Sequence, residues 1–194
     1  MSTDISQILR KKELAREDII RLLQVKGEEQ EALLDAAYRI KAEHVGKYTY
    51  FRGLIEFSNI CSKDCFYCGI RRGNKKVQRY ELSDEEVMQA VRYTAEKDWG
   101  SVVIQAGERS DTAFIERIDN LIKKIKAFPG KELGITLSLG DQDEATYRRW
   151  YASGAHRYLL RIESAKPELY TKLHPCDARH DFQRRLYSLK KKKK

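Results

Sequence analysis

Three cysteines stand close together in the chain, at Cys61, Cys65 and Cys68. They follow an apolar segment, Leu54 to Phe57, and are separated by three and then by two residues. Clustered thiols of this kind suit a soft metal centre in a reducing compartment better than disulfides. A 4Fe–4S cubane held by three cysteines keeps one iron open to a ligand from outside the protein. The spacing therefore predicts a cluster with one reactive iron.

Two other interpretations of these cysteines stay open. A zinc site is possible with Cys176 or a histidine as the fourth ligand, although zinc sites more often pair their cysteines as CxxC. Cysteines can also be small buried hydrophobic residues. The polar neighbours Asn59, Ser62, Lys63 and Asp64 argue against burial. We therefore favour the cluster and keep zinc as the alternative.

The predicted secondary structure before these thiols changes from helix to strand near residue 48. Helix-spaced apolar pairs run through the first 45 residues, with Gly27 and Gly46 as breaks. They predict a helical extension over residues 1–47 that packs beside the main fold. From Tyr48 to Phe57 the sequence is rich in aromatic and branched residues, which favour strands.

Strands and helices then alternate along the chain. Strands are predicted near residues 54, 102, 135 and 158, with helices over about 84–97, 111–127, 143–153, after Pro167 and over 182–189. The first of these helices opens on a capping box formed by Ser83 and Glu86. The alternation predicts an α/β fold with a parallel sheet. Parallel strands of this kind can close into a barrel or remain open, and four strands are too few for a closed barrel. We expect residues 48–189 to form an open sheet or part of a (β/α) barrel, with the cysteines at the carboxyl end of the first strand.

Composition limits the classes of partner. At 194 residues and 41% hydrophobic the chain can bury a core. The net charge of +9 includes Lys190 to Lys194, and without these five lysines it is 33 minus 29, or +4. Basic and acidic residues alternate along the predicted helices, so we expect solvated surface and no nucleic-acid binding. Because the sequence shows no signal peptide and no apolar run of about 18 residues, we expect a cytoplasmic protein without a membrane partner.

The cysteine loop and four later segments resemble a known family. Ile55 to Arg72 contains CxxxCxxC with Tyr67 before the last cysteine, which is the hallmark of the radical S-adenosylmethionine (SAM) enzymes. Together with Gln105 to Glu108, Thr136 to Gly140, Arg157 to Glu163 and Lys172-Leu-His-Pro, this loop resembles the FeFe-hydrogenase maturases of the HydE family. The resemblance runs from about residue 8 to Leu189. Biotin synthase and methylornithine synthase share the cysteine loop and remain alternatives.

The resemblance implies a function. The reduced cluster of such enzymes cleaves SAM to methionine and a 5′-deoxyadenosyl radical. HydE-type enzymes use this chemistry to help build the dithiolate bridging ligand of the hydrogenase active-site cluster. The implied partners are a small-molecule substrate, a reductant such as ferredoxin or flavodoxin, and the other hydrogenase maturases.

The resemblance also implies roles for individual residues. Gly107 and Glu108 would approach the SAM amino group, and Arg185 would bind the SAM carboxylate through its guanidinium. The remaining SAM-binding residues would be Tyr67, Ser138, Arg161 and Glu163, and substrate would meet Gln105 and Thr136. Three simpler interpretations stay open: an ordinary turn at Gly107 and Glu108, a satisfied core hydroxyl at Ser138, and a structural ion pair at Arg161 and Glu163.

Arg161 and Glu163 are two apart on a predicted strand, so both side chains should point inward if either does. A buried charged pair is costly unless it is paired or bound to a ligand, and for this reason the two residues are site candidates.

The C-terminal part departs from the family pattern. The segment Cys176 to Asp181 is longer than usual, and the relatives continue for about as many residues again. The chain closes instead on Lys190 to Lys194. We expect a truncated reading frame, and an inactive fragment that binds a cluster or nothing is the alternative to an enzyme.

Overall fold

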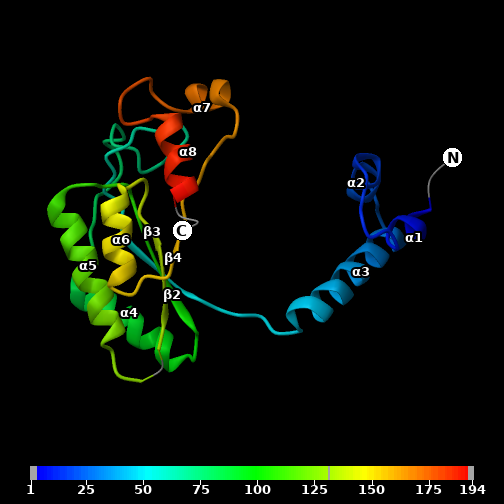
Figure 1. Ribbon diagram of the computed structural model, residues 1–194, viewed down its shortest axis with the longest axis horizontal. Helices are drawn as coiled ribbons and strands as arrows, with labels where there is room; N and C mark the ends of the chain where they lie inside the picture. Colours follow the sequence, from blue (N-terminus) through cyan, green and yellow to red (C-terminus); the bar gives the residue numbers. More distant parts are fainter. Residues whose placement is uncertain (1–3, 131, 192–194) are drawn as a thin grey trace. The chain divides into compact units, whose positions relative to one another are not determined.

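The computed structural model describes residues 4–130 and 132–191, so Lys192 to Lys194 of the predicted lysine tail lie outside the described residues. The chain divides into two compact units, Met1–Thr49 and Tyr50–Lys194 (Figure 1). Each unit is described by itself. The expected packing of the N-terminal extension beside the main fold stays a prediction.

The N-terminal unit is helical, as its apolar pairs predict. Its helices are α1 (Ile5–Ile8), α2 (Arg16–Leu23) and α3 (Glu28–Val45). Gly27 and Gly46 flank α3 with φ angles of 56° and 77°, a left-handed region that glycine enters without steric cost. A small core of Ile5, Ile8, Leu22 and Val25 holds the first two helices together. None of the residues of α3 is buried.

The second unit contains a parallel sheet in the order β1-β2-β3-β4. Its strands are β1 (Gly53–Ser58), β2 (Ser101–Ala106), β3 (Gly134–Ser138) and β4 (Arg157–Tyr158). Strands and helices alternate along the chain, which is the arrangement of a partial (β/α) barrel. The predicted fold class is therefore confirmed.

Three helices cover one face of this sheet (Figure 1). They are α4 (Asp84–Glu96), α5 (Thr112–Lys126) and α6 (Glu144–Ala152). Ser83 and Glu86 form the predicted capping box of α4, while Asp111 and Asp143 cap α5 and α6. The hydrophobic core between sheet and helices includes Phe57, Val91, Ile104, Phe114, Ile118, Leu137 and Trp150.

Two short helices follow the last strand, α7 (Pro167–Leu173) and α8 (Phe182–Lys191). Pro167 occupies the first turn of α7, as expected from its fixed φ and missing N–H. Both helices lie at the end of the sheet where the cysteine loop, drawn in teal, leaves β1 (Figure 1).

Two strand predictions were too long. Residues 48–52 are not in a strand, and β1 begins only at Gly53. The strand predicted from Tyr158 to Ile162 is reduced to β4, whose last ladder contact is the Leu159 N–H to the Leu137 carbonyl at 2.7 Å. Since β3 ends at Ser138 and Gly140 turns away with φ 80°, the next residues have no strand to pair with.

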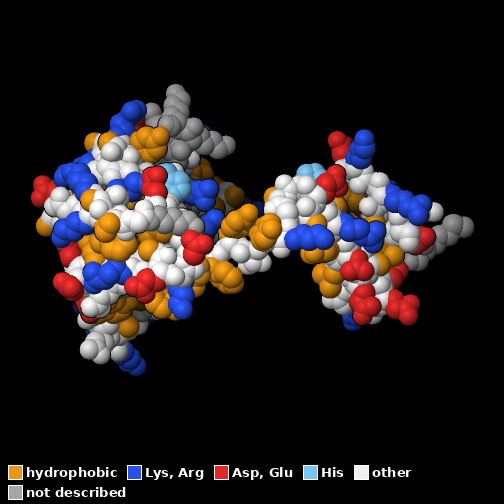
Figure 2. Space-filling model, turned by 90° about the horizontal axis from the view of Figure 1, so that it is seen from below, with side chains coloured by type: hydrophobic (Ala, Val, Ile, Leu, Met, Phe, Trp, Pro, Cys, Tyr) orange, Lys and Arg blue, Asp and Glu red, His pale blue; other side chains and the backbone are white. Residues whose placement is uncertain are grey.

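The surface carries both signs of charge. On the face shown in Figure 2, basic and acidic side chains are interspersed. Many are ion-paired along the helices, for example Lys123 with Asp119 and Arg148 with Glu144. No helix within the described residues is long and apolar enough to cross a membrane.

The core under the sheet sets the stability of the second unit. Ile104 is fully buried, so Ile104→Ala should leave a cavity and lower the free energy of unfolding by about 2–5 kcal/mol. Leu54→Ala is the matched control, because Leu54 is 57% exposed and should change stability far less. Urea denaturation followed by circular dichroism measures both. Equal losses in the two variants would contradict the burial assigned to Ile104.

Candidate functional site

The cysteine loop starts where β1 ends and is bonded to the end of the neighbouring strand. The Gly107 N–H donates to the Ser58 carbonyl at 3.0 Å. The Ser62 N–H and hydroxyl both donate to the Glu108 carbonyl, at 2.8 and 2.9 Å. These bonds place the first cysteine beside the carboxyl end of β2, at the edge where ligands of parallel α/β folds bind.

Gly107 allows this approach because it has no side chain. A Cβ atom at this position would lie 2.3 Å from the Ile60 carbonyl oxygen and 2.7 Å from the Cβ of Cys61. The sequence resemblance assigned Gly107 to a close approach of SAM. The structure shows a close approach of a different kind, in which the cysteine loop itself packs on the glycine.

Arg79 closes the far end of the loop. Its guanidinium donates to the carbonyls of Asn59 and Ile70 at 2.6 and 2.8 Å, and to those of Arg71 and Asn74 at 2.7 and 3.2 Å. One planar donor group therefore ties together four points of the segment that follows the cysteines.

Asn59 supports the same closure from the start of the loop. Its side chain donates to the Gln78 carbonyl at 2.7 Å and accepts from the Tyr80 N–H at 2.8 Å. The sequence offered no pattern that marks Arg79 or Asn59 for these roles.

Each of the three cysteines is partly buried, so that it is neither fully exposed to solvent nor fully enclosed. The sulfur of Cys61 accepts from the Lys63 and Glu108 N–H groups at 3.4 and 3.3 Å. Burial is the main cause that raises the pKa of the Cys61 and Cys65 thiols. Metal binding has to displace these protons, so it becomes easier as pH rises.

The cysteine loop carries an excess of positive charge. Residues 61–80 contain six basic side chains and one acidic side chain, a net charge of +5. The basic residues are Lys63, Arg71, Arg72, Lys75, Lys76 and Arg79, and the acidic residue is Asp64. Nearby cations stabilise thiolates and a cluster that carries them.

Glu108 joins the loop to the C-terminal helix. Its carboxylate lies 2.9 Å from Lys63 Nζ and 3.3 Å from the Arg185 guanidinium, and all three side chains are largely buried. Gly140 makes room for this carboxylate, because a Cβ there would lie 2.1 Å from Glu108 Cγ. The structure thus brings Glu108 and Arg185 together, as a binding site formed by both residues requires. The sequence alone did not fix the position of Arg185, because the segment Cys176 to Asp181 before α8 is longer than usual.

Polar side chains also line the sheet face away from the helices. Gln105 Nε2 donates to Glu56 Oε1 at 3.0 Å, and Gln105 lies in register with Ser138. Thr136 is two residues before Ser138 on the same face. Gln105, Ser138 and Thr136 therefore share one face of the sheet, at the end that carries the cysteine loop.

The prediction for Arg161 and Glu163 was wrong in its geometry. Both residues are exposed and lie beyond β4, outside any strand. Glu163 has φ 63°, a left-handed turn conformation that breaks an extended segment. The two charges are therefore not buried on one strand. Glu163 still lies near enough to Tyr67 to contribute, after burial and Cys65, to the raised pKa of the tyrosine.

Tyr67 contacts His174, the residue that follows α7. Its hydroxyl lies 3.5 Å from His174 Nε2, and the two rings meet edge to face. His174 is buried and bonds through Nδ1 to the Tyr170 carbonyl at 2.8 Å. His174 belongs to the Lys172-Leu-His-Pro segment that the sequence singled out without giving it a role.

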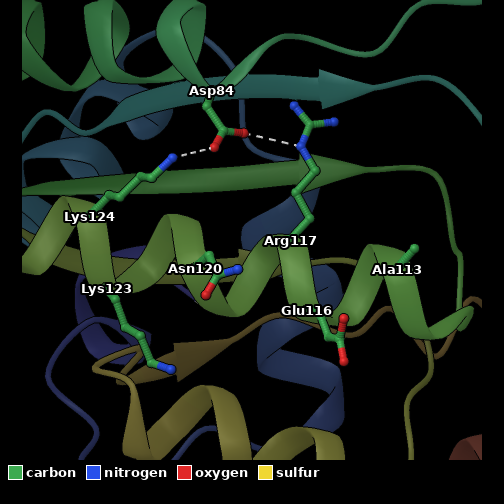
Figure 3. A pocket seen from close by; sticks show the side chains of 7 residues that line it. All are labelled: Asp84, Ala113, Glu116, Arg117, Asn120, Lys123 and Lys124. Carbon is green, nitrogen blue, oxygen red and sulfur yellow. Dashed lines mark hydrogen bonds and ion pairs between the residues drawn. The ribbon is translucent and has the colours of Figure 1, made fainter.

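A polar hollow lies away from the cysteine loop, between α4 and α5 (Figure 3). There the Asp84 carboxylate forms ion pairs with Lys124 Nζ at 2.6 Å and with Arg117 Nε at 3.1 Å. The hydrogen bond from Lys124 is the main cause that holds the pKa of Asp84 below its usual value. The basic side chains of this hollow are already paired with carboxylates. We therefore interpret the hollow as solvated surface and not as a ligand site. Among the described residues, no three His, Cys, Asp or Glu side chains converge on a single point as one bound ion requires.

The fold and the cysteine loop together define a protein class. A model of the radical SAM superfamily matches residues 55–194. The chain belongs to this superfamily, whose members are enzymes that bind a 4Fe–4S cluster and SAM. The resemblance predicted from the cysteine loop is therefore confirmed.

The relatives include two hydrogenase maturases and a 3-methylornithine synthase. The FeFe-hydrogenase maturase subunit HydE of Thermotoga maritima is 37% identical over 174 residues, 89% of this chain and 49% of HydE. The 3-methylornithine synthase of Methanosarcina acetivorans is 28% identical over 164 residues, 83% of this chain and 46% of that enzyme. The crystal structure of the maturase HydG superposes with a TM-score of 0.80 at 26% identity, covering 100% of this chain and 44% of HydG. The chain thus spans about half the length of these relatives.

Gly107 offers a sharp test of how the loop is placed. Gly107→Ala puts a methyl group against the Ile60 carbonyl, so we expect the loop to shift and the iron bound after anaerobic reconstitution to fall at least several-fold. Gly69→Ala is the control, since its Cβ would have no heavy atom within 4 Å. Iron and sulfide analysis measures both variants. Full iron loading of Gly107→Ala would contradict the close packing described above.

Arg79 tests the closure of the loop. Lysine keeps the charge but lacks the planar set of donors, so Arg79→Lys should lose most of the four carbonyl bonds and destabilise the second unit by about 1–3 kcal/mol. Arg72→Lys serves as the control, because Arg72 is exposed. Urea midpoints compare the two variants, and equal midpoints would show that the arginine bonds contribute nothing.

Proposed function

We propose that Cys61, Cys65 and Cys68 hold a 4Fe–4S cluster that binds SAM at its fourth iron. The observation that carries this proposal is the loop itself. It presents three partly exposed thiols at the carboxyl end of a parallel sheet, and two backbone N–H groups point at the sulfur of Cys61. Such hydrogen bonds to sulfur are a recognised means by which proteins tune a cluster.

The SAM site that we propose lies next to this loop. Glu108 and Arg185 meet within 3.3 Å and supply the opposite charges that the amino and carboxylate groups of SAM need. Lys63 Nζ lies 2.9 Å from the Glu108 carboxylate and holds it in place. We assign the remaining contacts with SAM to Gly107, Ser138, Tyr67, Arg161 and Glu163, the last two from exposed positions beyond β4.

The reaction that we propose is reductive cleavage of SAM to a 5′-deoxyadenosyl radical in the maturation of the FeFe-hydrogenase active site. The bound cluster supplies the electron for that cleavage. Identity of 37% to HydE supports the maturation role. We place the small-molecule substrate against the sheet face of Gln105 and Thr136, where polar groups are already in register. A reaction of the 3-methylornithine synthase type is the second candidate, supported by 28% identity.

The proposed surroundings follow from the chemistry of the cluster. Clustered free thiols persist in a reducing compartment, so we place the protein in the cytoplasm. A low-potential electron donor such as ferredoxin or flavodoxin would reduce the cluster, and other hydrogenase maturases are the proposed partners in assembly. The rival proposal is a fragment that binds a cluster but does not turn over, and an assay for cleavage of SAM decides between the two.

The ligand assignment predicts a simple pattern among the four cysteines. Replacing Cys61, Cys65 or Cys68 by alanine should abolish the cubane, seen as a loss of the iron–sulfur absorbance and of the bound iron and sulfide. Cys176→Ala should keep the wild-type content, because Cys176 is exposed and outside the loop. Loss of metal in Cys176→Ala, or zinc without sulfide in the wild type, would favour the zinc site instead.

A further inference from the structure

The segment between α7 and α8, Cys176 to Asp181, contacts the cysteine loop from a distant part of the chain. The Asp64 N–H donates to His180 Nε2 at 3.2 Å, and Lys63 Nζ donates to the Arg179 carbonyl. Figure 1 shows the segment joining α7 to α8 beside the teal loop. We call these six residues the latch.

His180 is the buried residue of the latch and is held from both sides of its ring. Its side chain is 1% exposed, and its Nδ1 lies 2.7 Å from Asp177 Oδ1. Because Nε2 accepts the Asp64 N–H, the ring proton sits on Nδ1 and is donated to the Asp177 carboxylate. Asp177 therefore fixes both the tautomer and the direction of the imidazole.

The accepted N–H belongs to the residue directly before Cys65. The Asp64 carboxylate is fixed as well, since it accepts from the Gly73 N–H at 2.8 Å. Next along the loop, the Phe66 N–H donates to the Leu173 carbonyl at 3.0 Å. Cys65 thus stands between two backbone groups that are anchored to the α7–α8 region, while Cys61 is anchored to β2.

We propose that His180, oriented by Asp177, is a positioning residue for the cysteine loop. It holds the Asp64 amide so that the Cys65 thiol is in place before a cluster arrives, and it slows loss of the cluster afterwards. The second effect rests on the proposed function, whereas the first is a property of the chain alone. The latch is the segment described above as longer than usual in the sequence, and the proposed positioning role accounts for its extra length.

The test uses His180→Phe, which keeps a ring but removes the acceptor, and His180→Gln, whose amide oxygen can accept near the place of Nε2. Amide exchange is measured by NMR on the isotope-labelled, cluster-free chain. We expect exchange of the Asp64 amide to be roughly tenfold faster in His180→Phe, the change expected for one lost hydrogen bond, and close to wild type in His180→Gln. Asp177→Ala should also speed this exchange. His44→Phe is the matched control, because His44 is exposed on α3.

The consequence for the cluster is measured on the reconstituted chain, as the rate at which a chelator bleaches its visible absorbance. We expect His180→Phe to lose the cluster several-fold faster and His180→Gln to be restored. Unchanged Asp64 exchange in His180→Phe, or equal defects in the phenylalanine and glutamine variants, would overturn the proposal. A wild-type chain that binds no cluster would overturn the proposed function, and the exchange experiment would still decide the positioning role.

Discussion

The site depends on one close backbone contact, where the cysteine loop packs against Gly107 at the end of β2. A Cβ at Gly107 would overlap the Ile60 carbonyl, so any other residue would push the loop away from the sheet. From this contact the Glu108 N–H reaches the sulfur of Cys61, while the Glu108 carbonyl receives Ser62. The same two residues, Gly107 and Glu108, therefore set both the position of the first thiol and its hydrogen bonding.

The rest of the loop is held by one of its own residues and by two distant parts of the chain. Arg79 closes it from its own far end, Glu108 pairs with Lys63 from just beyond β2, and His180 and Leu173 contact its backbone from the C-terminal part. Each bond satisfies a polar group that would otherwise be costly to bury. A loop that is fixed from several sides loses less entropy when it binds a metal centre, and this preorganisation favours cluster assembly.

Much of the fold could be predicted because local signals and the sheet agree. Ser83 and Glu86 mark the start of α4 by their own side chains, and the apolar runs that form β2 and β3 are buried as such runs require. The strand beyond β4 could not be predicted correctly, because its ending depends on where β3 stops and not on its own residues. For the same reason Arg161 and Glu163 were placed on a strand that does not exist. Arg79 and His180 escaped notice because their roles come from contacts with backbone carbonyls and amides, which leave no sequence pattern.

The central claim is that three cysteines of one preorganised loop hold a cubane with an iron that SAM can reach. The most direct measurement is the electron paramagnetic resonance spectrum of the anaerobically reconstituted and reduced chain, recorded with and without SAM. We predict a 4Fe–4S signal whose shape changes when SAM is added, because SAM becomes a ligand of the open iron. A cubane signal that SAM leaves unchanged, or no cubane signal at all, would contradict it.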